Sequence, residues 1–275
     1  MKLLFAFLVT SLLLITTINV HADPAEDRSI LLEHYKKTLP DIKFEDYVYG
    51  ALSLNPESKA QYDEIMEFPP FAADVRKGGS HWEKPFKNGE KFESCFKDDG
   101  VFVAASYPYF DDKAGKVITF ENAINNCLKA NNEAEIPYAG KDMAILTSYA
   151  RSLSDGARIR VKIKGSGALA AYEKGKQIYF TRNGQLNFAC ATCHIDYAGN
   201  KIRTEQLSML IGQTTHFPVF RAGTEPVTIQ ERFAGCQKSV RAKPYEFNST
   251  EYNDLEFFMS YMSNGLKMLT PVFRK

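Results

Sequence analysis

The run Cys190-Ala191-Thr192-Cys193-His194 constrains the fold of this chain more than any other stretch of its sequence. Two thiols separated by two residues and followed at once by a histidine form the attachment signature of a c-type haem. Each thiol can form a thioether with one vinyl group of the porphyrin, and the imidazole reaches the iron from the same side. The sequence therefore predicts one covalently bound haem c, held by Cys190 and Cys193, with His194 as the proximal iron ligand.

A zinc site and a redox-active thiol pair are the two alternatives for this motif. Zinc would need two more clustered ligands, for which His216 and Cys236 are the candidates. A thioredoxin-like pair is expected in a βαβ unit, whereas helical sequence flanks this motif. We therefore interpret the motif as a haem site.

The first 22 residues are typical of a secretory signal peptide. Lys2 precedes a mainly apolar run over residues 3–20, and Val20-His21-Ala22 fits a small-x-small cleavage site. The alternative is an uncleaved membrane anchor, because the apolar run approaches the length that spans a bilayer. We expect cleavage, no stable membrane insertion afterwards, and a mature protein in the periplasm.

The charge balance argues against one class of function. The chain has 34 Lys and Arg residues and 33 Asp and Glu residues. Cleavage removes Lys2 and no acid, so the basic and acidic residues balance in the mature protein. A neutral chain lacks the positive charge that drives binding to phosphates, so we expect no nucleic-acid partner.

The five cysteines suggest a pairing. Export permits disulfides, and haem attachment takes Cys190 and Cys193. An oxidising compartment is then expected to pair Cys95 with Cys127, which leaves Cys236 as an unpaired thiol. An odd cysteine in an exported protein indicates a reactive thiol or a metal ligand.

The sequence contains a weak internal repeat. Thr119 precedes Cys127 by eight residues, and Thr228 precedes Cys236 by the same distance. A predicted helix follows in each half, and the two helices end in similar sequences, Ser154-Asp155-Gly156 and Ser263-Asn264-Gly265. The alternative is a chance similarity between two helical stretches.

When the two halves are aligned at their first cysteine motifs, the first half lacks haem-binding residues. Cys95 is placed opposite Cys193, Phe96 opposite His194 and Phe92 opposite Cys190. The first half therefore resembles a haem domain that has lost one attachment cysteine and the iron ligand. A disulfide between Cys95 and Cys127 could close the space that a haem would have filled.

The predicted fold is mainly α, with two cytochrome c-like domains, the first of which has lost its haem. We expect helices over residues 141–153 and 168–180, and a third that Asn248 caps and that continues through Met262. Residues 154–167 are rich in Gly, Ser, Arg and Lys, so we place the domain boundary there. The predicted parts are a signal peptide (1–22), an N-terminal wrapping segment (23–85), a haem-free domain (86–156) and a haem-binding domain (157–275). We expect the wrapping segment to cover the first domain or to contact a partner.

The second axial ligand of the iron is open between Cys236 and several alternatives. The alternatives that follow the motif are Met209, His216, Met259, Met262 and Met268. Met259 and Met262 fall on the apolar face of the last helix, where packing in the core is expected. Thiolate ligation lowers the haem potential and suits a catalytic haem. Spacing alone does not decide between these ligands.

Arg232 favours a chemical role for Cys236. The two residues are four apart on a predicted short helix, so they project from one face. A guanidinium there would stabilise a thiolate and could hold an anionic substrate through paired hydrogen bonds. The equivalent residue of the first half is Ala123. The alternative is that Arg232 is an exposed surface charge.

Four segments carry a resemblance to a known family. They are residues 188–194, 215–221, 232–236 and 261–265. In these segments the chain resembles SoxA, the family of cytochrome subunits in the SoxAX complex of bacterial sulfur oxidation. Some members of that family bind haem in both domains. Because this sequence has no C-x-x-C-H in its first half, it resembles the single-haem branch.

The resemblance implies a site and a reaction. His194 and Cys236 would ligate the iron, Cys236 would be the catalytic residue as a persulfide, and Arg232 would bind the sulfur anion. Cys95 and Cys127 would form the disulfide. The implied enzyme is an L-cysteine S-thiosulfotransferase, which joins thiosulfate oxidatively to a cysteine thiol of the carrier protein SoxYZ. The reaction releases two electrons, so the partner cytochrome SoxX would supply a second haem.

Two other functions stay open. In a simple electron-transfer cytochrome, Cys236 is only a ligand, and Cys236→Met removes no thiosulfate chemistry. In a non-catalytic haem sensor or scaffold, the haem-free half is a docking surface, and Arg232→Ala leaves turnover unchanged.

Overall fold

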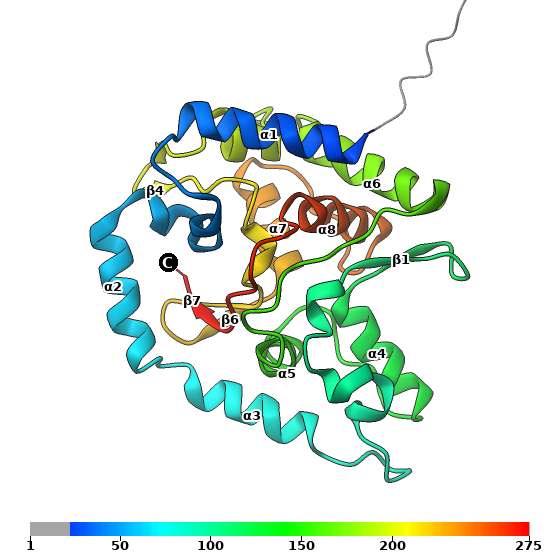
Figure 1. The fold of residues 1–275 in the computed structure, drawn as a ribbon. Coiled ribbons are helices and arrows are strands. Elements are labelled where there is room, and N and C mark those ends of the chain that lie inside the picture. The colour runs from blue at the N-terminus through cyan, green and yellow to red at the C-terminus, as the bar shows by residue number, and fades with distance from the viewer. Residues whose placement is uncertain (1–22, 275) are drawn as a thin grey trace, which may run out of the picture.

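The computed structural model describes residues 23–274, so the predicted signal peptide (1–22) lies outside the described residues. The chain is mainly helical and has short strands (Figure 1). The helices are α1 (Pro24–Thr38), α2 (Pro56–Glu67), α3 (Ala72–Trp82), α4 (Phe120–Ala130), α5 (Lys141–Ser152), α6 (Gly165–Phe180), α7 (Ile229–Ser239) and α8 (Thr250–Met262). The strands are β1 (Tyr109–Asp111), β2 (Lys116–Ile118), β3 (Lys201–Ile202), β4 (Glu205–Gln206), β5 (Val219–Arg221), β6 (Glu225–Val227) and β7 (Val272–Phe273). Within residues 23–274, no helix has both the length and the apolar character needed to cross a membrane.

The second half of the chain repeats elements of the first. β2, α4 and α5 begin at residues 116, 120 and 141, and β6, α7 and α8 begin at residues 225, 229 and 250, a constant shift of 109. Each later helix also packs against another helix of its own half, α5 against α3 and α8 against α6. The mainly helical, two-part fold predicted from the sequence is therefore confirmed.

The two cysteine-bearing helices begin in the same way. Thr119 caps α4 and Thr228 caps α7, and each threonine side chain accepts a hydrogen bond from the backbone N–H three residues on. The side chains at those third positions, Asn122 and Glu231, accept a bond from the backbone N–H of the threonine in return. This reciprocal arrangement satisfies N–H groups that the start of a helix would otherwise leave without partners.

The same two side chains also join the halves. Asn122 of α4 donates a hydrogen bond to Asn248 Oδ1, just before α8. Glu231 of α7 accepts one from Gly140 N, just before α5. Each half thus holds the start of the other half's later helix. Because Asn248 is engaged in this contact, α8 is capped by Ser249, one residue later than the sequence predicts.

The segments that follow α5 and α8 pair with each other reciprocally. Their hydrogen bonds form two pairs, and the bonds of each pair are related by the same shift of 109. In the first pair, Ile159 N donates to Leu266 O and Met268 N donates to Ala157 O. In the second pair, Val161 N donates to Asn264 Oδ1 and Thr270 N donates to Asp155 Oδ1. Residues 154–167, in which we placed the domain boundary, are therefore not a free linker. They form one side of a joint whose other side is the chain that follows α8.

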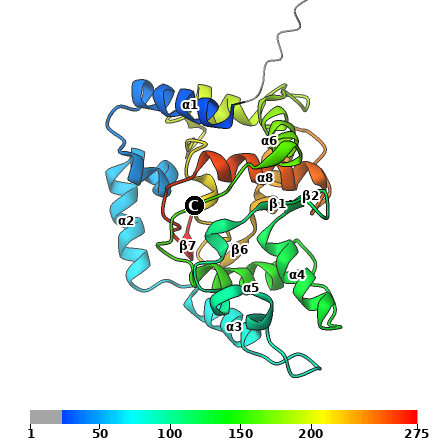
Figure 2. The same ribbon diagram turned by 45° about the vertical axis from the view of Figure 1, so that its right-hand side comes forward.

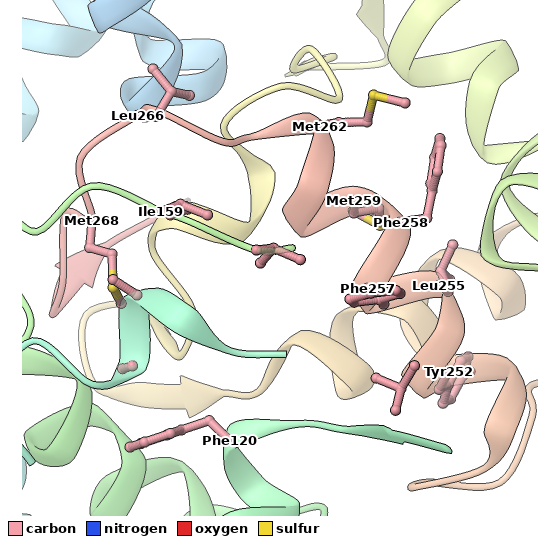
Figure 3. Close-up of a cluster of buried hydrophobic side chains, with 14 of the residues drawn as sticks. Phe120, Ile159, Tyr252, Leu255, Phe257, Phe258, Met259, Met262, Leu266 and Met268 are labelled. Carbon is pink, nitrogen blue, oxygen red and sulfur yellow. The ribbon is translucent and has the colours of Figure 1, made fainter. Parts of the chain in front are cut away.

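One continuous core passes through both halves. In Figure 3, Phe257 and Phe258 of α8 lie in the same buried cluster as Phe120 from the first half. Met259 and Met262 are only 4% and 2% exposed, so the prediction that both pack in the core is confirmed. Burying a side chain of this size contributes about 1.5–3 kcal/mol. The core therefore holds the two halves together as one body.

Buried aromatic rings occupy the interior of the first half, beside a disulfide whose Cys95 is exposed and whose Cys127 is buried. The disulfide joins Cys95 to Cys127, the pair that the sequence suggests. Trp82 of α3 stacks on Phe92 with ring centroids 5.1 Å apart, and Phe96 lies 5.4 Å from Trp82. All three rings are buried.

The N-terminal segment contacts both halves. α1 lies along α6 in both views (Figures 1 and 2), and there Asp27 pairs with Lys176 at 2.6 Å. Arg28 donates to the carbonyls of Met262 and Asn264 at the end of α8. Further along, α3 packs against α5 in the first half. The expectation that residues 23–85 cover the first domain is therefore incomplete, because α1 covers the second.

Candidate active site

The C-x-x-C-H motif forms a helical turn after α6. Thr192–Asp196 is one turn of π-helix. Thr192 fixes its start, because Ala189 N donates to Thr192 Oγ1 at 3.1 Å and Thr192 N donates to Ala189 O at 3.2 Å. A helix precedes the motif and the short hairpin of β3 and β4 follows it. The motif is therefore not part of a βαβ unit, and the structure does not support the thioredoxin-like alternative.

The His194 ring is held by one of its nitrogens. Nδ1 lies 2.8 Å from the carbonyl oxygen of Ser208 and 2.7 Å from the side-chain amide of Gln213. The Ser208 carbonyl can only accept, so Nδ1 carries the hydrogen and Nε2 keeps the lone pair that a metal needs. The amide nitrogen of Gln213 is itself a donor, so it touches Nδ1 without bonding to it and donates instead to Ser208 Oγ at 3.0 Å. Burial, opposed by the bond to the Ser208 carbonyl and assisted by the charge of Arg232, lowers the pKa of His194 to about 4. The ring is therefore neutral at physiological pH.

Tyr35 of α1 holds the backbone of the motif. Its hydroxyl donates to His194 O at 2.6 Å and accepts from Leu210 N at 2.9 Å. The side chain is fully buried, and burial raises its pKa well above the usual range, so it stays a neutral donor. The partners of its hydroxyl lie 159 and 175 residues further along the chain, so local sequence does not reveal them.

Cys236 lies close to the two predicted attachment thiols, although it follows Cys193 by 43 residues. All three thiols are free and partly buried. Burial first, and then the neighbouring Cys236 and Cys193, raise the pKa of Cys190 to about 12 against an opposing backbone hydrogen bond. Burial and Cys236 also raise the pKa of Cys193. Such mutual effects fall off with distance, so the fold brings the three thiols within range of one another's charge, although not into a metal-binding cluster.

The other residues considered as ligands are buried. Met209, Met259, Met262 and Met268 are buried in the hydrophobic core. His216 Nδ1 lies 3.1 Å from Thr215 Oγ1, and burial and the nearby Arg274 hold the pKa of His216 well below its usual range. Over residues 23–274, no group of three or more His, Cys, Asp or Glu side chains is arranged to hold a metal ion. The zinc alternative therefore has no ligand set in this part of the chain.

Two arginines bring positive charge to the thiols. Arg232 is exposed near the start of α7 and acts on His194, as described above. Arg221, at the end of β5, is partly buried. Burial and then Arg232 lower the pKa of Arg221, whereas Glu205 and Cys236 raise it. The sequence analysis assigned no role to Arg221. Its position in the sequence, shortly before the predicted helix that carries Arg232 and Cys236, could have indicated that it lies near them.

These residues fit a c-type haem. The site offers two free thiols at the attachment spacing and a neutral imidazole whose Nε2 is available. A further thiol, on Cys236, lies close to both. This is the donor chemistry that thioether attachment and axial ligation require.

The sequence is similar to those of known cytochrome proteins. The family profile described as SoxA/TsdA, cytochrome c domain, matches residues 77–159 and 174–268. A protein of Chlorobaculum tepidum named L-cysteine S-thiosulfotransferase subunit SoxA is 43% identical over 242 residues, which cover 88% of this chain and 84% of that protein. The protein of the same name from Allochromatium vinosum is 39% identical over 257 residues, with coverage of 92% and 91%.

The fold is similar to a solved structure as well. The crystal structure of SoxXA from P. pantotrophus contains a chain that superposes with a TM-score of 0.68 at 33% sequence identity. The match covers 75% of this chain and 79% of the other. Sequence and fold therefore point to the same family.

Proposed function

This chain belongs to the SoxA/TsdA cytochrome c family, and we propose that it is the SoxA-type subunit of a periplasmic L-cysteine S-thiosulfotransferase. One observation carries the proposal. The fold places the unpaired thiol of Cys236 beside Cys190 and Cys193, with Arg232 one helical turn before it. A spare thiol and an unpaired cation at a haem site suit sulfur-anion chemistry better than simple electron transfer.

The proposed reaction joins thiosulfate to a cysteine thiol of a SoxYZ-type carrier protein. A sulfur–sulfur bond forms between the outer sulfur of thiosulfate and the carrier cysteine. The thiol releases its proton, and the pair of sulfur atoms gives up two electrons. A dianion and a neutral thiol thus become a singly charged S-thiosulfonate, one proton and two electrons, so atoms and charge balance.

Cys236 is the proposed catalytic residue, acting as a nucleophile in persulfide form. Arg232 lies four residues earlier on α7, so both side chains project from one face of the helix. Its guanidinium can hold the incoming sulfur anion by charge-assisted hydrogen bonds and stabilise negative charge on the Cys236 sulfur.

Cys190 and Cys193 are the residues that would attach haem c, and His194 Nε2 and Cys236 Sγ are the atoms that would bind its iron. A haem c bound there supplies a one-electron acceptor, so the two-electron coupling also requires the haem of a SoxX-type partner in a heterodimer. The bond from Nδ1 to the Ser208 carbonyl orients the His194 ring for this role.

We propose that the first half, residues 86–156, binds no haem. In the alignment that sets Cys95 opposite Cys193, Phe92 and Phe96 stand opposite Cys190 and His194, and both pack against the buried Trp82. The protein would therefore carry a single haem, in residues 157–275. Residues 1–22 would be removed on export to the periplasm, and the balanced charge of the mature chain supports a protein partner rather than nucleic acid.

A coupled thiosulfate assay on the complex with its SoxX partner and a SoxYZ-type carrier tests the proposal. Cys236→Ala should abolish formation of the carrier adduct, whereas the wild type forms it. Cys236→Met separates the simple electron-transfer alternative, which requires that this variant keeps a low-spin haem and loses no thiosulfate chemistry. Full adduct formation by either variant would overturn the proposed function.

A further inference from the structure

Arg221 is a cation without a partner in the described chain. Among residues 23–274, its guanidinium forms no ion pair and no side-chain hydrogen bond, and the same holds for Arg232. Glu205 on β4 acts on Arg221 but does not form an ion pair with it. Partly buried arginines normally find a carboxylate or carbonyl partner, so the unpaired guanidinium of Arg221 needs an explanation, whereas Arg232 is exposed.

The fold brings the two guanidiniums together. β5 pairs with β6 so that Arg221 lies opposite Glu225, and β6 leads through Thr228 into α7, which carries Arg232. Side chains near the start of a helix lean back toward its N-terminus, and therefore toward this hairpin. The mutual electrostatic effects of Arg221, Arg232 and Cys236 agree with this placement. Two like charges held close together repel each other unless an anion lies between them.

The internal repeat shows that this pair is specific to the half with the C-x-x-C-H motif. The three-residue strands β1 and β5 match, so Asp111 of the first half stands where Arg221 stands in the second. Ala123 likewise stands where Arg232 stands. Both arginines are therefore absent from the half whose cysteine, Cys127, is closed in a disulfide. The two cations and the free thiol occur together.

We propose that Arg221 is a second anion-binding residue, which together with Arg232 holds a doubly charged sulfur oxyanion at the Cys236 thiol. This inference rests on the proposed function and adds the charge selectivity of the site. Thiosulfate is a dianion at neutral pH, and one guanidinium neutralises only half of its charge. A second guanidinium at a fixed position favours a dianion over a monoanion of similar size.

Calorimetric titration of thiosulfate into the haem-loaded complex, without carrier protein and hence without turnover, measures this binding directly. Losing one charge-assisted hydrogen bond weakens binding about 10- to 100-fold, and we expect that increase in Kd for Arg221→Gln. Arg221→Lys should recover part of the affinity, because it keeps the charge but not the planar fork. Lys113→Gln, in the matching hairpin of the first half, should bind as the wild type does.

Two further readouts separate binding from a structural role. Arg221→Gln should raise KM in the coupled assay with little change in kcat, and sulfate should lose its advantage over nitrate as a competitor. An unchanged Kd in Arg221→Gln overturns the inference, as does a change in its haem absorbance or Tm, which would indicate a structural residue. If the wild-type complex itself neither binds thiosulfate nor forms the adduct, the proposed function fails instead.

Discussion

At the scale of single residues, the site depends on groups that hold the haem motif without belonging to it. Tyr35 bonds the carbonyl of His194 and the N–H of Leu210, and the Ser208 carbonyl holds the imidazole. The motif itself consists of five consecutive residues and can be recognised from the sequence alone. The Tyr35 contact joins residues 159 positions apart, so no local pattern could have revealed it.

Tyr35→Phe should therefore destabilise the protein and loosen the motif. The change leaves a buried carbonyl and a buried N–H without their partner, and each unsatisfied group costs about 1–3 kcal/mol. Urea unfolding of the haem-loaded protein should show a loss of that order, with a shifted haem absorbance. Tyr197→Phe is the matched control, because Tyr197 is 57% exposed and follows the same motif. Equal stability of the Tyr35 variant and the wild type would contradict this account.

At the scale of elements, a buried charge cluster joins α4, α5 and α8. Arg151 of α5 lies 3.6 Å from Glu121 of α4 and 3.8 Å from Glu256 of α8, and all three side chains are buried. Burial raises the pKa of Glu256 to about 8; Glu121 adds to the rise, and Arg151 and a hydrogen bond with Gln230 oppose it. Folding therefore takes up a proton at this carboxyl near neutral pH.

The cluster makes stability depend on pH in a definite direction. The folded pKa of Glu256 lies above its unfolded value of about 4.3. Its contribution is complete below that value and is lost as pH rises toward the folded pKa. Glu256→Gln mimics the protonated acid, so the free energy of unfolding should fall less between pH 5 and pH 9 than in the wild type, by about 1 kcal/mol or more.

The check is urea unfolding at both pH values. Glu251→Gln serves as the control, because Glu251 is an exposed residue of the same helix. Asp254 also has a raised pKa, caused first by burial, but it is present in all three proteins and cancels in the comparison. Parallel pH profiles for wild type and Glu256→Gln would show that the carboxyl does not bind the proton.

The sequence predicted the helices well, but it did not predict the backbone pairing that joins the two halves. The predicted helices over 141–153 and 168–180 correspond to α5 (Lys141–Ser152) and α6 (Gly165–Phe180), because caps and apolar periodicity are local signals. Residues 154–167 have the composition of a loop, and their backbone partners lie about a hundred residues further along the chain. Local sequence could not show that pairing.

At the scale of the whole molecule, the two halves share one plan and differ where chemistry is expected. The capping boxes and the paired segments after α5 and α8 follow a shift of 109 residues. The departures concentrate around the cysteines: Cys127 is closed in a disulfide, whereas Cys236 is free. The spacing of the cysteines in the sequence predicted this contrast. The correspondence between Asp111 and Arg221 became visible only in the structure, where both residues end matching strands, β1 and β5.

The disulfide should stabilise the first half without serving the haem site. It closes a loop of 32 residues, and removing a cross-link of that size costs about 3 kcal/mol. Replacing Cys95 and Cys127 together by serine should lower Tm in a thermal scan, while the haem absorbance of the folded protein stays unchanged. Loss of haem binding in this double variant would show that the first half takes a direct part in the haem site.

The most direct test of the account is the chemical state of Cys236 itself. Peptide mass spectrometry of the haem-loaded wild-type complex, isolated active and without reductant, should find an additional sulfur atom on Cys236 and none on Cys95 or Cys127. Treatment with a thiol reductant should remove that sulfur together with the activity, and thiosulfate should restore both. An active complex whose Cys236 carries no added sulfur at any stage would contradict the claim that this thiol performs the sulfur chemistry.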